Sequence, residues 1–139
     1  MGALVRDSGK TAVPRGTERI LLVDDNIDVR LTAREQITSL GYTVSEADSG
    51  DAALAVLEAN VGAFDLVFTD LVMPGLIDGI DLARIVRTRW PGLAILLTSG
   101  FASEQDTAEN RDVSDFEVLR KPYRKPALAT ALRHALSGK

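Results

Sequence analysis

Short apolar runs alternate with amphipathic segments along most of the chain, from Arg19 onward. This alternation predicts five strands, at residues 19–24, 43–47, 65–69, 93–98 and 116–120. Strands that alternate with helices form parallel sheets, because each return to the same edge of the sheet takes a crossover helix. Three of the strands are almost wholly apolar, as strands covered on both faces are, whereas 43–47 is more polar and is predicted at an edge. The pattern therefore predicts an α/β fold with helices on both faces of a parallel sheet.

The segments between these strands carry helical periodicity. Apolar residues at the spacing of one buried helix face predict four helices, over residues 27–40, 50–60, 79–90 and 126–137. Segment 103–112 differs, because Ala108 is its one apolar residue. A helix there would bury almost nothing, so we expect it to be short or mobile.

Length, charge and composition limit the class of protein. The 139 residues fit one domain, predicted over 18–138, after an arm or linker at 1–17 that has no periodicity. The net charge of -4 argues against nucleic-acid binding, which needs a basic face. No apolar run approaches the roughly 20 residues that span a bilayer, and the first 19 residues lack the apolar core of a signal peptide. We therefore expect a cytoplasmic protein that binds neither nucleic acid nor membrane.

Polar side chains of a particular kind stand at the carboxyl ends of four predicted strands: Asp24 and Asp25, Asp70, Thr98 and Ser99, and Lys121. The carboxyl ends of parallel strands meet at one edge of a sheet, which is where such folds bind ligands. Clustered carboxylates repel one another, and a hard cation with oxygen ligands, such as Mg²⁺, relieves the repulsion. A Lys and a hydroxyl can then neutralise and hydrogen-bond phosphoryl oxygens. The set predicts a site for Mg²⁺ and a phosphoryl group, with a carboxylate as acceptor.

Each of these residues taken alone has a simpler interpretation. A single Asp after a strand is most often a turn former or a helix cap. The agreement of four strand ends favours a functional site over four unrelated turns.

Four segments, in order, resemble the motifs of the response regulator receiver domain of two-component signalling: residues 20–25, 67–74, 96–100 and 118–122. The resemblance runs from about Glu18 to Leu136. It implies a doubly wound, flavodoxin-like (βα)₅ fold with a five-stranded parallel sheet in the order 2-1-3-4-5. It also implies a phosphoprotein of a phosphorelay in signal transduction, either a free-standing single-domain regulator or the receiver of a hybrid histidine kinase.

The resemblance implies a role for each site residue. Asp70 would take the phosphoryl group from a phosphohistidine on a histidine kinase or histidine phosphotransfer protein. Asp25 and Asp70 would ligate Mg²⁺ with the main-chain carbonyl of Val72, and Asp24 would act largely through a metal-bound water. Lys121 would pair with Asp70 at rest and with the phosphoryl group afterwards. Such a domain catalyses its own phosphorylation and dephosphorylation and turns over no separate substrate.

The family pattern also guides the choice of hydroxyl. Alternation along a strand turns Thr98 and Ser99 to opposite faces, so one of them can serve. The family has Thr or Ser before a small residue, and Ser99 before Gly100 fits this best, so Ser99 is predicted. Tyr123 follows the family's aromatic preference after an expected cis peptide at Lys121–Pro122.

Two features depart from the family pattern. The loop at residues 73–79 is one residue longer than in many relatives. Val118 occupies the position of the usual switch aromatic, three residues before the Lys. The signal is therefore expected to pass through Ser99 and segment 101–112. The output surface would be formed by the family's fourth helix, which corresponds to segment 103–112, together with the fifth strand at 116–120 and the fifth helix at 126–137.

Two other functions are alternatives. A phosphoaspartyl phosphatase of the haloacid dehalogenase type also uses an Asp after a strand and Mg²⁺. It needs a second Asp two residues later, where Val72 stands, and it needs room for a substrate cap. A degenerate receiver that acts only as a binding module is the other alternative, but every acidic, hydroxyl and Lys position is intact. The sequence leaves the cognate kinase and the oligomeric state open.

Overall fold

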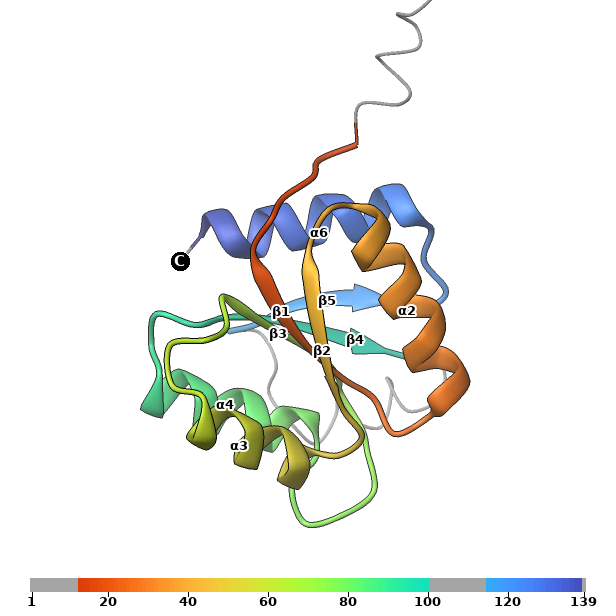
Figure 1. Ribbon diagram of the computed structural model, residues 1–139. Helices are drawn as coiled ribbons and strands as arrows, with labels where there is room; N and C mark the ends of the chain where they lie inside the picture. The colour runs from red at the N-terminus through yellow and green to blue at the C-terminus, as the bar shows by residue number, and fades with distance from the viewer. Residues whose placement is uncertain (1–12, 101–114, 139) are drawn as a thin grey trace, which may run out of the picture.

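A computed structural model describes residues 13–100 and 115–138 (Figure 1). Five parallel strands form one sheet in the order β2-β1-β3-β4-β5. The strands are β1 (Arg19–Val23), β2 (Thr43–Ala47), β3 (Leu66–Asp70), β4 (Ala94–Ser99) and β5 (Glu117–Arg120). The helices of the described ranges are α2 (Ile27–Ser39), α3 (Gly50–Ala59), α4 (Gly79–Arg89) and α6 (Lys125–Ser137). The predicted flavodoxin-like fold and its strand order are confirmed, while segment 103–112, where any helix was expected to be short or mobile, lies outside the described residues.

Helices cover both faces of the sheet, with α2 and α6 on one face and α3 and α4 on the other (Figure 1). Alternate residues of the strands face the two layers. Leu22 of β1, Phe68 of β3 and Leu96 of β4 pack with α2 and α6. Leu21 and Val67 pack with α3 and α4. This alternation fixes the direction of every side chain up to the strand ends, where the polar residues stand.

Strands β3 and β4 each end one residue later than predicted, at Asp70 and Ser99. The reason is that the ladder between them continues to the strand ends, with Asp70 opposite Thr98. The amide of Leu71 then donates to the carbonyl of Thr98 at 2.8 Å. Backbone pairing with a neighbouring strand decides where a strand ends. The apolar pattern does not show this pairing, because the last paired residues are polar.

Residues 13–18, called here the N-terminal anchor, lie against the domain ahead of the predicted boundary at residue 18. Val13 packs against the core between the sheet and α6. Arg133 of α6 donates to the carbonyl of Arg15 at 3.2 Å and binds the Glu18 carboxylate at 2.6 Å. Its guanidinium holds the pKa of Glu18 below its ordinary value. Contacts with the domain therefore begin at Val13, while residues 1–12 of the predicted arm lie outside the described residues.

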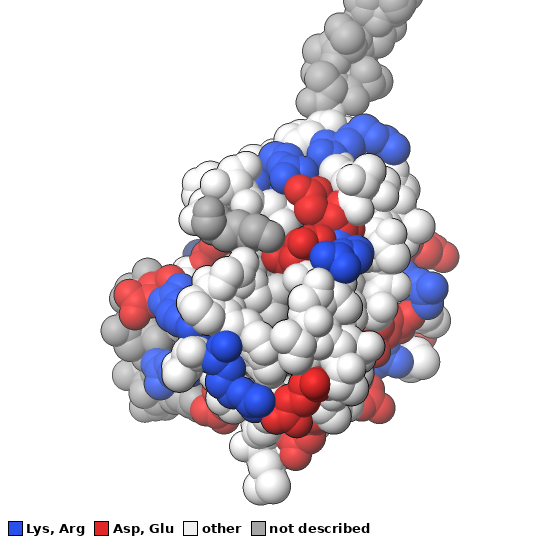
Figure 2. Space-filling model, turned by 60° about the vertical axis from the view of Figure 1, so that its left-hand side comes forward, with Lys and Arg blue, Asp and Glu red and all other residues white. Residues whose placement is uncertain are grey.

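Acidic and basic side chains adjoin on the face shown in Figure 2. Ion pairs account for several of these neighbours across the molecule, among them Arg19 with Asp65 at 3.2 Å and Arg89 with Glu58 at 2.6 Å. Exposed pairs of this kind stabilise a fold by about 0.2–1 kcal/mol each. None of the helices described here is long and apolar enough to cross a membrane.

Candidate functional site

Three carboxylates come together at the carboxyl ends of β1 and β3. These strands are neighbours in the sheet, with Val23 paired to Thr69, so the residues that follow lie side by side. Asp24, Asp25 and Asp70 each place one carboxylate oxygen within 4.8 Å of the oxygens of the other two. Asp24 is buried, Asp70 is half-buried and Asp25 is exposed. The cluster is thus open to solvent on one side and closed by the protein on the other.

Lys121 lies against this cluster from the end of β5. Its Nζ is 3.5 Å from Oδ2 of Asp24 and 3.5 Å from Oδ2 of Asp70. The Lys121 amide donates to the carbonyl of Ser99 at 2.8 Å, which ties the residue after β5 to β4. The Lys121–Pro122 peptide is cis, as the resemblance implied. One ammonium group therefore balances part of the repulsion between two buried or half-buried carboxylates.

The electrostatics of the site follow from burial and from the neighbouring charges. Burial raises the pKa of Asp70, with the Lys121 ammonium acting against this rise and the Asp24 carboxylate adding to it. Burial also raises the pKa of Tyr123 to about 12, and the charges of Asp24 and Asp70 add to the effect. The Tyr123 ring lies 6.4 Å from that of Phe68, between the core and the site. A raised carboxyl pKa in a cleft marks a group whose charged form lacks compensation, as at many functional sites.

Every backbone and carboxylate position of Asp24 has a polar neighbour. Its amide donates to the Ala47 carbonyl at 3.2 Å, and its Oδ1 accepts from the Asn26 amide at 2.9 Å. Its carbonyl accepts from Nη1 of Arg30 at 2.7 Å. Oδ2 faces Lys121. Arg30 is a residue that the sequence did not single out, because an Arg on an amphipathic helix usually belongs to its solvated face.

The strand register distinguishes Thr98 from Ser99. Thr98 is directly opposite Asp70, and it follows Leu96 in the alternate positions that face α2 and α6, as Asp70 follows Phe68. Ser99 has the opposite direction, which it shares with Leu97 of the core on the α4 side. Residues opposite each other in a sheet point the same way, so Thr98 shares the direction of Asp70. Ser99 is the last residue of β4, at the edge where parallel sheets bind ligands, and its role as the hydroxyl of the site stays a prediction.

The hydroxyls of Thr98 and Ser99 are both buried and both lack a hydrogen-bond partner among the described residues. Thr98 is 4% exposed and Ser99 2%. Leaving a buried hydroxyl unpaired costs about 1–3 kcal/mol. Two such groups at the carboxyl end of β4 fit a site that takes up an oxygen-rich ligand.

The donor set fits Mg²⁺. All three side chains offer carboxylate oxygens, which are the ligands that this ion prefers. The spacing of up to 4.8 Å is close to the roughly 4.2 Å that separates opposite ligands around Mg²⁺, so small side-chain movements suffice. Asp25 is exposed, which leaves room for the waters that Mg²⁺ retains.

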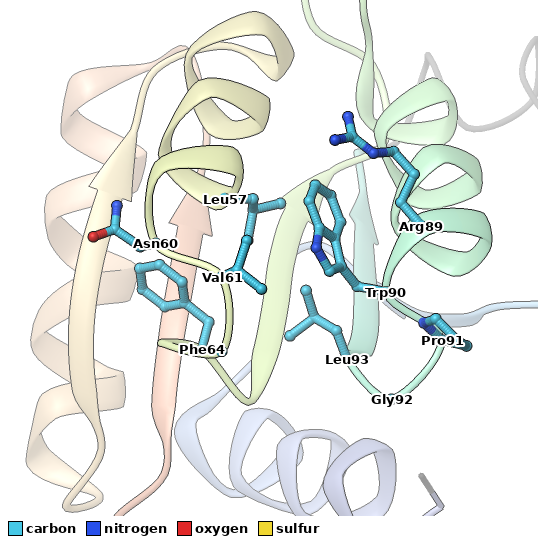
Figure 3. Close-up of a pocket in the computed structure, with 10 residues that line it drawn as sticks. Leu57, Asn60, Val61, Phe64, Arg89, Trp90, Pro91, Gly92 and Leu93 are labelled. Carbon is cyan, nitrogen blue, oxygen red and sulfur yellow. The ribbon is translucent and has the colours of Figure 1, made fainter.

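A pocket lies at the other end of the molecule, and none of the site residues Asp24, Asp25, Asp70 and Lys121 lines it. Figure 3 shows it between the C-terminal ends of α3 and α4, where Trp90 and Leu57 line a cavity of about 350 Å³. Arg89 stacks on the Trp90 ring at 4.5 Å and also binds Glu58. The single Trp is thus remote from the carboxylates.

Comparisons with known proteins agree with the fold and the motifs. Residues 20–133 match the family model of the response regulator receiver domain. The response regulator receiver protein CpdR of Brucella abortus is 36% identical over 106 residues, covering 76% of this chain and 86% of CpdR. The sensor kinase CckA of the same organism is 36% identical over 121 residues, covering 87% of this chain and 13% of CckA. The chain therefore spans a small part of some relatives and most of others.

Solved structures support the same grouping. A response regulator receiver domain protein from Clostridium thermocellum superimposes with a TM-score of 0.76 and 26% identity, covering 87% of this chain and 95% of that one. A response regulator receiver protein from Sinorhizobium medicae gives 0.75 and 32%, covering 87% and 95%. The resemblance seen in the four motifs is confirmed, and it decides against the haloacid dehalogenase-type alternative. The chain belongs to the response regulator receiver domain family.

Proposed function

We propose that this receiver domain takes a phosphoryl group onto Asp70 from a phosphohistidine of a histidine kinase or histidine phosphotransfer protein in the cytoplasm. Mg²⁺ would be held by the carboxylates of Asp25 and Asp70 and the main-chain carbonyl of Val72, with Asp24 acting through a water. One observation carries the proposal: three carboxylate oxygens lie within 4.8 Å of one another, and the Lys121 ammonium is 3.5 Å from two of these groups. A site built for a cation and an anion together fits phosphoryl transfer.

The chain's own residues perform the transfer. A carboxylate oxygen of Asp70 attacks the phosphorus in line with the bond to the imidazole nitrogen, which leaves with the electron pair of that bond. An ionised carboxylate is already a nucleophile, so the step needs no general base. The Lys121 ammonium then neutralises a phosphoryl oxygen, having balanced Asp70 before the transfer. Bound Mg²⁺ would supply further positive charge to the transferring group.

The partner is expected to dock beside Lys121. Ile27 and Leu31 on α2 are 56% and 46% exposed, although both are large apolar residues. A hollow of about 370 Å³ separates this helix from the residues after β5, and it is lined by Asp28, Val29, Thr32, Ala33, Lys121, Pro122 and Tyr123. An exposed apolar surface bordering an ionic site is the usual character of a protein-binding face. The phosphohistidine would enter between this surface and the carboxylates.

The proposed output surface combines β5 and α6 with segment 103–112, which lies outside the described residues. Val118, at the position of the usual switch aromatic, packs near Leu71 and Ile80 on the α4 side of the sheet. Leu71 directly follows Asp70, so a change at the acceptor has a short packed route to β5. We propose that the new phosphoryl charge draws Ser99 and Lys121 towards it and shifts this packing.

Ser99→Ala is expected to slow phosphorylation about tenfold, because it removes one hydrogen bond to a charged group, worth about 1.5 kcal/mol. Thr98→Val is the matched control: Val keeps the shape of Thr98 and suits a strand, and the change should alter the rate less than about twofold. The rate of adduct formation by intact mass measures both. A slow Thr98→Val beside a normal Ser99→Ala would contradict the prediction that Ser99 supplies the hydroxyl.

The proposed function itself is tested with acetyl phosphate, a small donor that needs no partner protein. In the presence of Mg²⁺ the chain is expected to gain one phosphoryl group by intact mass, and none when EDTA removes the metal. Failure of the unaltered chain to form the adduct at saturating donor and Mg²⁺ would contradict the proposal and favour a binding module without phosphotransfer.

A further inference from the structure

Arg30, in the first turns of α2, connects the acidic cluster to the edge of the sheet. Its Nη1 donates to the main-chain carbonyl of Asp24 at 2.7 Å, and its Nε donates to Oε1 of Glu46 on β2 at 2.8 Å. The side chain is 12% exposed, whereas Arg34, one turn later, is 50% exposed. One planar guanidinium thus ties together α2, the end of β1 and β2.

The carbonyl that Arg30 holds belongs to the peptide between Asp24 and Asp25. The orientation of this peptide sets the direction in which the Asp25 chain and side chain continue. The amide on the other side of Asp24 is already fixed by the Ala47 carbonyl at 3.2 Å. Arg30 therefore completes the support on the side of Asp25, which is exposed and has little packing of its own.

We propose that Arg30 is a positioning residue, which holds the peptide between Asp24 and Asp25 so that both carboxylates face the cation. This inference rests on the proposed Mg²⁺ site. The hydrogen bond from Arg30 to the Asp24 carbonyl supports this inference, because it is the contact of Arg30 with a residue of the carboxylate cluster. The other bond, to Glu46, lies on β2, away from the cluster.

Arg30 acts mainly through geometry, because its charge is already balanced. Glu46 accepts from both Arg30 and Arg34, and these two guanidinium groups hold its pKa below the ordinary value. Arg34 binds the Glu46 carboxylate and, within the described part of the chain, makes no hydrogen bond to the backbone of Asp24. The chain therefore offers a matched pair: each Arg binds the same carboxylate, and Arg30 alone of the two binds the backbone of Asp24.

The test compares Arg30→Gln with Arg34→Gln by calorimetric titration with Mg²⁺ and by thermal unfolding in EDTA. Arg30→Gln is expected to weaken Mg²⁺ binding about tenfold, as loss of a residue that orients metal ligands commonly does. Arg34→Gln should change the dissociation constant less than about twofold, because the contact it loses is an ion pair with Glu46 that does not involve Asp24 or Asp25. Unfolding in EDTA measures the purely structural effect of each change.

Equal Mg²⁺ affinities in the two variants would overturn the inference, as would an Arg30→Gln variant that melts earlier but binds Mg²⁺ like the unaltered chain. Should Arg30→Gln not fold, the test uses Arg30→Lys instead. A single ammonium group cannot bind both the Asp24 carbonyl and the Glu46 carboxylate in the way that the planar guanidinium does. Its affinity is expected to fall several-fold, and an affinity equal to that of Arg34→Gln would overturn the inference. Absence of Mg²⁺ binding by the unaltered chain would overturn the proposed Mg²⁺ site and this inference together.

Discussion

Asp70→Asn is expected to abolish the phosphoryl adduct completely and, in Mg²⁺-free buffer, to raise the melting temperature of the protein. The amide is no nucleophile, so transfer stops. The same change removes one of three carboxylates that lie within 4.8 Å, and Lys121 keeps its contact with Asp24 at 3.5 Å. Relief of such repulsion is expected to stabilise the fold by about 1 kcal/mol, or roughly 4 °C in melting temperature.

The gain in stability should depend on pH. Because the pKa of Asp70 is raised in the folded protein, the folded state holds this proton more readily than the unfolded chain does. The ionisation of Asp70 therefore lowers stability as the pH rises from the ordinary value of 3.8 through the raised one. Asp70→Asn should be more stable than the unaltered chain above this window and nearly equal to it below pH 3.8.

Asp48→Asn is the control for both parts, since Asp48 is exposed and lies outside the cluster. It should form the adduct and melt within about 1 °C of the unaltered protein, as surface changes usually do. Intact mass after acetyl phosphate treatment and circular dichroism melting curves are the measurements. A phosphoryl group on Asp70→Asn, or a lower melting temperature at neutral pH, would contradict the interpretation of the cluster.

Gly79→Ala is expected to lower the free energy of unfolding by about 3 kcal/mol or more, the upper part of the range for overpacking. A Cβ on Gly79 would lie 1.7 Å from the carbonyl oxygen of Asp70 and 2.9 Å from the Cα of Leu71. Both are backbone atoms at the end of β3, which cannot turn aside as a flexible side chain can. Gly79 is the first residue of α4, where Ala would otherwise be the better helix former by about 1 kcal/mol.

Gly92→Ala is the matched control, because a Cβ there meets no heavy atom within 4 Å. Its free energy of unfolding should change by less than about 0.5 kcal/mol. Urea unfolding followed by circular dichroism gives both values. A Gly79→Ala protein as stable as the Gly92→Ala protein would show that β3 and α4 can separate at no cost, contrary to the close contact described above.

The strands and the acidic cluster could be predicted from sequence because both depend on local order along the chain. Apolar runs mark buried parallel strands, and the residues after them meet at one edge whatever the details of packing. Asp24, Asp25, Asp70 and Lys121 were placed together by this argument alone. The structure brings the four within ion-pair or metal-ligand distance.

Which of Thr98 and Ser99 faces α2 and α6 could not be predicted this way, and the choice of Ser99 as the hydroxyl of the site stays a prediction. In a strand buried on both faces, Ile95, Leu96 and Leu97 are all apolar, so the sequence carries no period that tells one face from the other. The register with β3 supplies the missing information. Arg30 escaped notice for a related reason: its two acceptors, the Asp24 carbonyl and Glu46, come from elements whose positions a helical pattern does not contain.

The N-terminal anchor has a practical consequence for attaching this protein to a support. Arg133 fastens residues 13–18 at the amino ends of the strands, whereas the carboxylates stand at the carboxyl ends. A tether joined ahead of Val13 would leave the molecule at the pole opposite the acidic cluster (Figure 1). An immobilised domain would then present Asp70 to the solution, with its orientation set by one half-buried ion pair, Arg133 with Glu18, at the opposite end.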